Sequence, residues 1–479
     1  MNAHKKQFVI GNQPWHVNDD WKTVPIEEGL FLCHCPDLCV ATIKDRNSET
    51  WYLLGLAVQT DKEKKDPLTE ISRSVTSQVR QIHHCWAGRW ILIGAAEIHM
   101  DCCGLLGCFY TTVSGARWIS SSLAILQEIG GFTPRPETLK HKSGMEWYPL
   151  PFSRFEGIYQ LLSSQILNLK TLHIEVRNLP KPVSGLSYDE IIKKLEEKVK
   201  AGLSNACHPR KRVFIQLTAG YDSRSVLAAI HSLGIDAEAY TTEGVYISHA
   251  DATLPSKIAK AAGCHHRYIR RGPFSEEKEA LYDHHTGRNS ADIDRMKYSE
   301  GQWDLFRKGD LILRGNMFET GTYRIYHYLG SDFTVASMLK YTHLENRPDC
   351  FGVQAFSEWM NWVRQTPMDG LGWQDRFYLE QRVGGWLSAI EQSLDLTEPE
   401  RFTVANCHDI LSLMLSASVE KRSARAYYFD LIRNMCPALL QYPFNPPDPK
   451  FKKLQKRLIK INKMPLHELY KKLKHRLLN

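Results

Sequence analysis

The sequence has no long apolar run. None of its 479 residues belongs to a stretch that approaches the roughly 20 apolar residues needed to span a bilayer. Lys5 and Lys6 are not followed by the apolar segment of a secretory signal. These absences predict a cytoplasmic protein, and the twelve cysteines fit that compartment as reduced thiols.

The cysteines also lack the spacing of a structural zinc site. The densest group, Cys33, His34, Cys35 and Cys39, contains no paired CxxC motif. We interpret these cysteines as small buried side chains at the edge of a strand, and Cys102–Cys103 in the same way. A metal-binding role for either group is the alternative.

Charge is unevenly distributed along a chain of ordinary composition. The net charge is +8, with 43% hydrophobic and 24% charged residues, which is typical of soluble globular proteins. Residues 450–479 contain eleven Lys or Arg and one acid, Glu468. This stretch alone therefore carries +10, and the other 449 residues sum to −2.

Within this tail, apolar residues recur at helical spacing among the cations. The pattern predicts an amphipathic basic segment that contacts an anionic membrane, at its inner face, or an anionic glycan. Nucleic acid is disfavoured, because the cations lack the repeated aromatic interleaving that stacks bases. Packing of the apolar stripe against the rest of the protein is the alternative.

Two patterns of secondary structure precede the tail, as expected for a chain too long for one core. Residues 1–180 contain short β segments and one helical stretch, 67–82, which predicts an α+β layered domain. In residues 181–447 apolar strands alternate with helices. This alternation predicts an α/β domain with a parallel sheet and a largely helical C-terminal part. Residues 448–479 form the tail.

The segment 213–227 places small residues between a buried strand and a helix. Thr218, Ala219 and Gly220 would let backbone N–H groups approach a bound anion, and a helix beginning near Ser223 would present its positive end. Asp222 would repel a phosphate directly, so its expected role is to hold Mg²⁺. An ordinary strand–turn–helix is the alternative, and the GxxxxGK[ST] spacing of a Walker loop is missing.

The run LTAGYDSR, residues 217–224, resembles the SGGxDS loop of the asparagine synthetase-like ATP pyrophosphatases. That family includes class B asparagine synthetases, β-lactam synthetases and lasso-peptide cyclases. Thr218 stands for the usual Ser and Ala219 for the first Gly. The resemblance implies that ATP contacts the loop through Leu217, Thr218, Ala219, Gly220, Tyr221 and Ser223.

Other segments follow the family in order. AYTTEG (239–244) corresponds to the adenine-contacting strand, which implicates Thr241 and Thr242. LRGNMFETGTYRIYH (313–327) corresponds to the GEGADELFGGY segment, which implicates Gly315 in ATP binding and Glu319, with Asp222, in Mg²⁺ binding. The family's catalytic lysine has no clear match, and the candidates by position are Lys450 and Lys452. Arg288 and Arg224 are candidate substrate contacts, with a capping loop and a helix surface as their alternatives.

Residues 87–126 and 156–170 resemble the glutamine amidotransferase domain of the same family. That chemistry needs a cysteine after the initiator Met, because its α-amine is the general base for its thiol. Residue 2 is Asn. The resemblance therefore implies an amidotransferase-like fold without glutaminase activity.

Together these features predict an ATP- and Mg²⁺-dependent carbon–nitrogen ligase. The enzyme would adenylate a small-molecule or peptide carboxylate, release pyrophosphate, and transfer the acyl group to an amine or ammonia with release of AMP. Alternatives are another adenylating enzyme, such as one of RNA modification, or a non-catalytic scaffold that retains the fold. A second copy of the chain, forming a homodimer, is a further candidate partner.

Overall fold

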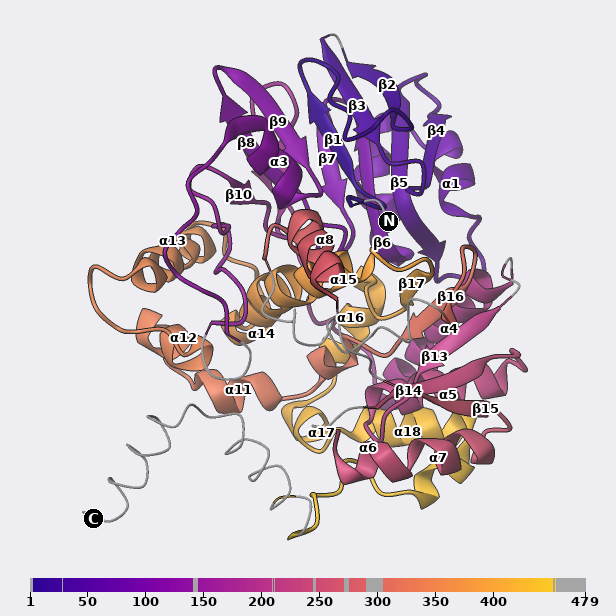
Figure 1. Ribbon diagram of the computed structural model, residues 1–479. Helices are drawn as coiled ribbons and strands as arrows, with labels where there is room; N and C mark the ends of the chain where they lie inside the picture. Colours follow the sequence, from indigo (N-terminus) through magenta and orange to yellow (C-terminus); the bar gives the residue numbers. More distant parts are fainter. Residues whose placement is uncertain are drawn as a thin grey trace, which may run out of the picture.

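The chain folds into an N-terminal part built on antiparallel sheets and a C-terminal part built on a parallel sheet (Figure 1). This order agrees with the predicted succession of α+β and α/β patterns. Within the described part of the chain, no helix is both long and apolar enough to cross a membrane. The computed structural model describes residues 3–27, 29–140, 145–208, 210, 212–243, 247–270, 275–289, 305–450 and 453. The predicted amphipathic tail lies almost entirely outside these residues.

The N-terminal part contains two six-stranded sheets, ordered β10-β8-β9-β1-β3-β2 and β12-β11-β7-β6-β5-β4. Buried side chains from both sheets form one core, for example Ile10 and Leu32 from the first and Leu54 and Ile91 from the second. The strands are β1 (Phe8–Gly11), β2 (Lys22–Glu27), β3 (Leu30–His34), β4 (Val40–Lys44), β5 (Thr50–Gln59), β6 (Trp86–Gly94), β7 (Glu97–Met100), β8 (Phe109–Val113), β9 (Ala116–Ser120), β10 (Tyr159–Gln160), β11 (Gln165–Asn168) and β12 (Ile174–Val176).

Short helices cover these sheets. The predicted helix over 67–82 is two helices, α1 (Pro67–Arg73) and α2 (Thr76–Ile82). The interruption occurs at Ser74, whose hydroxyl donates to the Glu70 carbonyl at 2.8 Å and whose own carbonyl accepts from the Arg46 amide at 2.9 Å. Side-chain and tertiary hydrogen bonds thus replace the helical ladder there. A third helix, α3 (Leu123–Gly130), begins at its N-cap Ser122 and contacts β8 and β9.

The predicted position of the cysteine group at a strand edge is wrong. Cys33 lies in β3, which pairs with β1 on one side and β2 on the other. Cys33 and Cys35 are buried free thiols, as expected, whereas Cys39 is exposed. The buried thiols of Cys33 and Cys35 therefore belong to the core beside the first sheet.

The parallel sheet has the order β15-β14-β13-β16-β17. The chain starts in the centre at β13 (Val213–Gln216), builds β14 (Glu238–Thr242) and β15 (His265–Ile269) on one side, and then places β16 (Leu311–Arg314) and β17 (Glu400–Thr403) on the other. Strand β17 was not predicted, because its four residues lie within a helical region. Helix α4 (Tyr188–Cys207) precedes β13, and the helices between β13 and β16 include α5 (Asp222–Ser232), α6 (His249–Thr253), α7 (Pro255–Ala261) and α8 (Glu276–Thr286).

The remainder of the C-terminal part is mainly helical, as predicted. One continuous run passes from α14 through a ten-residue π-helix, η3, into α15. The elements are the 3-10 helix η2 (Phe318–Gly321), α11 (Arg324–Leu329), α12 (Val335–Thr342), α13 (Phe351–Gln365), α14 (Trp373–Phe377), η3 (Tyr378–Leu387), α15 (Ser388–Leu394), α16 (His408–Leu415), α17 (Val419–Ser423), α18 (Ala426–Met435) and the 3-10 helix η4 (Pro437–Gln441).

The two parts share a polar interface. Arg89 of β6 donates through both terminal nitrogens to the Asp395 carboxylate, each at 2.8 Å, and both side chains are buried. Removing one member of such a pair typically costs about 3–5 kcal/mol, because the other charge is left buried without a partner. Strand β6 also contacts β17. The parallel sheet is thus joined directly to the second antiparallel sheet.

Candidate functional site

The segment 217–221 links β13 to α5 at the carboxyl end of the central strand. Because the chain crosses from one side of β13 to the other, the gap between β13 and β16 is a topological switch point. Ligands of open parallel sheets bind at such points, outside the carboxyl ends of the strands. The predicted phosphate loop therefore occupies the position in this sheet where a ligand is expected.

The loop is held by hydrogen bonds among its own small side chains. The Thr218 amide donates to Ser223 Oγ at 3.1 Å, and the Gly220 amide donates to Thr218 Oγ1 at 3.2 Å. The Ala219 amide donates to the Asp251 carboxylate at 2.8 Å. All three loop amides thus have partners within the protein, which differs from the expectation that they face an anion.

One hydroxyl hydrogen and one helix end remain for a ligand. Thr218 Oγ1 and Ser223 Oγ lie 3.1 Å apart, so one hydroxyl hydrogen bridges them and the second is left for another acceptor. Helix α5 starts at Asp222, and the first amides of a helix have no acceptor within it. The loop retains the donors of an anion site, but side chains supply more of them than predicted.

Gly315 lets β16 approach the start of α5. A Cβ atom at this position would lie 2.6 Å from the backbone carbon of Asp222 and 2.6 Å from the nitrogen of Ser223. No side chain fits at that distance. The predicted ATP-binding glycine thus has a packing role, which is to seat the N-terminus of α5 against the end of β16.

Asp222 has an unusual electrostatic environment. Its pKa is raised to about 7, mainly by burial; a hydrogen bond from the Tyr428 hydroxyl acts to lower the pKa, and the negative charge of Glu319 acts to raise it. Positive charges on Arg324 and Arg425 act in the lowering direction. The two carboxylates predicted to share Mg²⁺ are therefore electrostatic neighbours, although they are separated by 97 positions in sequence.

Glu319 lies on η2, which Tyr427 and a buried ion pair hold in place. Tyr427 donates to the Phe318 carbonyl, and its neighbour Tyr428 donates to Asp222. Behind η2, Arg422 of α17 pairs with Asp375 at 2.6 Å and donates to the Thr320 and Thr322 carbonyls at 3.3 Å. Arg324 of α11 pairs with Glu319 at 2.6 Å.

Arg224 is buried, so the alternative of a helix-surface arginine is wrong. Its NH1 and NH2 groups donate to the carbonyls of Ala219, Leu439, Tyr442 and Pro443 at 2.7–3.2 Å. The guanidinium also stacks 3.7 Å from the ring centre of Phe444. These contacts tie the loop to the chain after η4. Phe444 in turn stacks on Tyr221, with ring centres 4.4 Å apart.

On the β14 side, Thr241 donates to the Leu217 carbonyl at 2.7 Å. Because that bond uses the hydroxyl hydrogen, the Nε2 of His266, 2.9 Å away, must carry a proton and donate to Thr241 Oγ1. Burial lowers the pKa of His266 to about 4, so this ring is neutral near pH 7. Thr241 is buried and braces the loop, whereas the adjacent Thr242 is partly exposed.

A pocket of about 160 Å³ opens beside Glu319. Arg324 and Arg382 bring positive charge to it. Arg382 pairs with Glu146 at 2.7 Å and stacks on Trp386, 3.7 Å from the ring centre. The remaining lining residues are Thr320, Ile325, Tyr328, Tyr341 and Tyr378. Tyr378 and Arg382 both come from the π-helix, a rare element that frequently occurs at functional sites.

Arg288 lies apart from this cluster of interactions. Arg288 follows α8, which contacts α3 and α15, and its guanidinium pairs with Asp283. Lys450 lies within the described residues, and it is exposed. Lys452 lies outside the described residues, as does 290–292, the end of the segment that contains Arg288. The roles assigned to these three residues stay predictions.

Sequence reasoning missed Asp251, Tyr428 and Arg425. Asp251 and Ser248 form an Ser-x-x-Asp cap, in which Ser248 Oγ accepts from the Asp251 amide at 2.9 Å, and this motif is visible in the sequence. Tyr428 lies in an apolar run, 206 positions beyond Asp222, where an aromatic residue indicates only a core position. Its function depends on a tertiary contact that no local pattern contains.

No family model and no curated protein matches the chain. Among solved structures, NMN synthetase from Francisella tularensis is 15% identical, with a TM-score of 0.20 over 50% of this chain and 97% of that one. Glutamine PRPP amidotransferase from B. subtilis, complexed with ADP and GMP, is 9% identical, with a TM-score of 0.23 over 66% and 70%. An allosteric regulatory enzyme of purine biosynthesis is 11% identical, with a TM-score of 0.21 over 64% and 68%. Similarities this low carry no argument about function, which rests on the geometry.

Proposed function

We propose that this protein is an ATP-dependent ligase that adenylates a carboxylate at the end of β13 and transfers the acyl group to an amine or ammonia. The observation that carries the proposal is that Asp222 and Glu319 are electrostatic neighbours at the switch point of the parallel sheet, where burial and the charge of Glu319 raise the pKa of Asp222, to about 7. Arg324 already pairs with Glu319, so the buried charge of Asp222 is the one that a further cation or a proton would compensate.

Mg²⁺ fits this donor set. It prefers oxygen ligands and is typically held by one or two carboxylates together with substrate phosphates. Asp222 and Glu319 would hold the ion, and the bound ion would neutralise phosphate charge. Tyr428 keeps its proton, because burial raises the pKa of its phenol, and its hydrogen bond fixes the orientation of the Asp222 carboxylate.

The proposed phosphate contacts are Thr218, Ser223 and the first amides of α5. They supply hydrogen bonds and the positive end of the helix dipole. Arg425 and Arg324 are the cations whose charges act on Asp222, so we assign to them charge stabilisation of the leaving pyrophosphate. Arg224 is left out of this set, because its NH1 and NH2 groups already bind carbonyl oxygens.

The proposed site for the acyl substrate is the pocket beside Glu319. A carboxylate bound by Arg382 would lie next to the nucleotide site, and positioning of this kind is what an adenylation step requires. The pocket volume of about 160 Å³ is below the roughly 300–1,000 Å³ of drug-sized sites. The proposed substrate, or the part of it that enters, is therefore small.

The test is release of both pyrophosphate and AMP from ATP. The full chain is incubated with Mg²⁺, ATP and a panel of small carboxylates, with and without ammonia or an amine. We expect pyrophosphate release that depends on one carboxylate, and AMP release that increases when the amine is added. Release of ADP and phosphate instead, or a failure to bind ATP at all, would contradict the proposal.

A further inference from the structure

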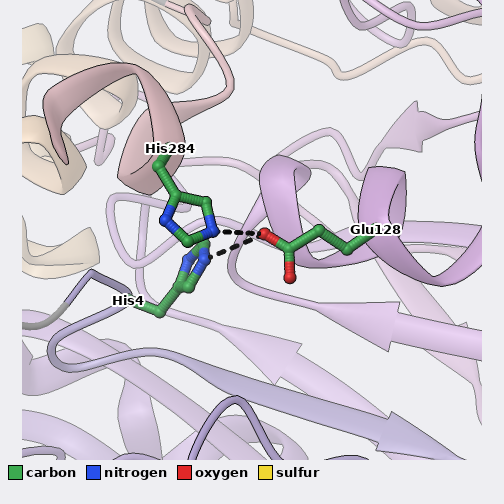
Figure 2. Close-up of side chains that lie close together, drawn as sticks. All are labelled: His4, Glu128 and His284. Carbon is green, nitrogen blue, oxygen red and sulfur yellow. Dashed lines mark hydrogen bonds and ion pairs between the residues drawn. The ribbon is translucent and has the colours of Figure 1, made fainter. Parts of the chain in front are cut away.

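Two histidines and a glutamate from three separate segments converge at the junction of the N-terminal and C-terminal parts (Figure 2). His4 precedes β1, Glu128 lies on α3, and His284 lies in the last turn of α8. Glu128 Oε1 is 3.3 Å from His4 Nε2 and 2.8 Å from His284 Nε2. The three potential ligand atoms all lie within 4.8 Å of one another.

These separations are close to those of a tetrahedral zinc site. Zn²⁺ binds imidazole nitrogen and carboxylate oxygen at about 2.0–2.2 Å, so neighbouring ligand atoms in a tetrahedron lie about 3.3 Å apart. The His4–Glu128 separation of 3.3 Å already has this value. His284 must shift its ring by a small amount, and its side chain is 54% exposed and able to rotate.

The buried ligand is oriented by its surroundings. The His4 backbone amide donates to His285 Nδ1 at 2.9 Å, and His285 Nε2 bonds the Gln392 carbonyl at 2.8 Å, which fixes the tautomer of His285. His4 Nδ1 lies 3.4 Å from the hydroxyl of Ser122. A proton on Nδ1 that faces Ser122 leaves the Nε2 lone pair free for a metal, and ligating histidines usually have such a partner for their second nitrogen.

Helix α3 carries two members of this arrangement. Its N-cap Ser122 faces the second nitrogen of His4, and Glu128 approaches His4 Nε2 from the same helix. His4 and His284 face each other nearly perpendicularly, with ring centres 4.8 Å apart and an interplanar angle of 82°. Figure 2 shows both rings directed toward the same carboxylate oxygen.

We propose that His4, Glu128 and His284 bind one Zn²⁺ ion, with water in the fourth position. Three protein ligands with one open position fit the chemistry of Zn²⁺. The ion joins the segment before β1 and α3, in the N-terminal part, to α8 of the C-terminal part. Its bonds to both parts fasten them together, and the water occupies an open position of the kind that purely structural zinc sites lack. A purely hydrogen-bonded cluster, in which Glu128 accepts from both rings, is the competing outcome.

The experiment is a Zn²⁺ titration of the full chain after treatment with a chelator, followed by calorimetry and by the absorption spectrum of the Co²⁺-substituted protein. The variants are His284→Ala and Glu128→Gln, because both side chains are partly exposed and tolerate change better than the buried His4. His265→Ala is the matched control. That histidine is 75% exposed and pairs with Glu238 at 3.4 Å, but this pair belongs to no three-ligand group among the described residues.

We expect one equivalent of Zn²⁺ to bind the wild type and His265→Ala with equal affinity, and Co²⁺ to give a tetrahedral spectrum. His284→Ala and Glu128→Gln should bind more weakly by a larger factor than the roughly 10–100-fold that loss of an outer-shell partner causes. Equal binding by the wild type and His284→Ala would overturn the proposal, as would a wild type that binds no Zn²⁺. Either result would assign the cluster to hydrogen bonding alone.

Discussion

The Asp222–Glu319 pair and the His4–Glu128–His284 cluster both place a carboxylate among elements that are distant in sequence. The groups around the carboxylates differ. Tyr428 and two arginines accompany the first, whereas imidazole nitrogens face the second. Oxygen donors suit Mg²⁺ with phosphates, and imidazole with one carboxylate suits Zn²⁺. The groups around a carboxylate, rather than the carboxylate itself, therefore distinguish the proposed nucleotide site from the proposed zinc site.

The largest effect is expected from Asp222→Asn. This change removes a carboxylate oxygen that binds Mg²⁺ while Asn keeps an acceptor for Tyr428, so pyrophosphate release should fall by about 100-fold or more with the fold retained. Circular dichroism and thermal unfolding check the fold. Asp236→Asn is the control, because Asp236 is an exposed aspartate just beyond the other end of α5. Equal losses in the two variants would show that the effect is not specific to the Asp222 carboxylate and would contradict its proposed role.

Zinc removal should separate the two sites. At free Zn²⁺ 100 times its Kd, a site present only in the folded state stabilises the protein by about 2.7 kcal/mol, so chelation should lower the unfolding temperature. Magnesium-dependent ATP binding should not change, because none of the three proposed zinc ligands lies at the β13–α5 loop. Thermal unfolding and ATP titration of the same sample measure both. If chelation abolished ATP binding, and Zn²⁺ but not Mg²⁺ restored it, the zinc cluster and the nucleotide loop would not be independent sites.

Gly315→Ala should cost about 1–3 kcal/mol of folding free energy and weaken ATP binding. The added methyl would lie 2.6 Å from the backbone of Asp222 and Ser223, and so it must displace the start of α5. Gly384→Ala is the control, because its Cβ would meet its nearest neighbour, the Cys103 carbonyl oxygen, at an ordinary 3.4 Å. Chemical denaturation and calorimetry give the two quantities. If Gly315→Ala binds ATP as tightly as the wild type, ATP binding does not depend on the exact position of α5.

The pH dependence of stability should carry the signature of Asp222. This group ionises near 3.8 in the unfolded chain and near 7 in the folded protein. Between these values the folded state binds more protons, so the contribution of Asp222 to stability falls as pH rises from about 4 to about 7. Without metal, Asp222→Asn should therefore lose this component of the slope, and denaturation at pH 5 and pH 8 measures it. An identical slope in the wild type and the variant would contradict the raised pKa.

The smallest effect is expected from Tyr428→Phe. The Tyr428 hydrogen bond lowers the pKa of Asp222, so its removal should move the acidic limb of the pH–activity profile to higher pH, with activity regained at alkaline pH. A merely structural tyrosine would reduce activity at all pH values without moving the limb. Tyr427→Phe is the control, because Tyr427 donates to the Phe318 carbonyl rather than to Asp222.

The sequence predicted the central features of the parallel sheet. Strands β13, β14 and β16 and helix α5 occur within the alternation of apolar strands and helices predicted for residues 181–447. These signals are local, because a buried parallel strand is apolar along its length and a helix has one apolar face. Strand β17 has only four residues, ERFT. Its conformation is set by pairing with β16, which is a tertiary property.

The candidate site was predictable only in outline. The spacing of Thr218, Asp222 and Ser223 is local, and so the loop was found. The partners that set its chemistry are not local: Glu319 and Tyr428 reach Asp222 from positions 97 and 206 residues away. His4, Glu128 and His284 are likewise isolated in sequence and converge only in the fold. Distances between such residues depend on packing that no single segment encodes.

In the proposed function, Asp222 and Glu319 hold Mg²⁺ for ATP at the end of β13. Calorimetric titration of the full chain with ATP, with and without Mg²⁺, tests it most directly when wild type, Asp222→Asn and Asp236→Asn are compared. The structure predicts that Mg²⁺ strengthens ATP binding in wild type and Asp236→Asn and has little effect in Asp222→Asn. ATP affinity that is independent of Mg²⁺ in all three proteins would contradict the claim.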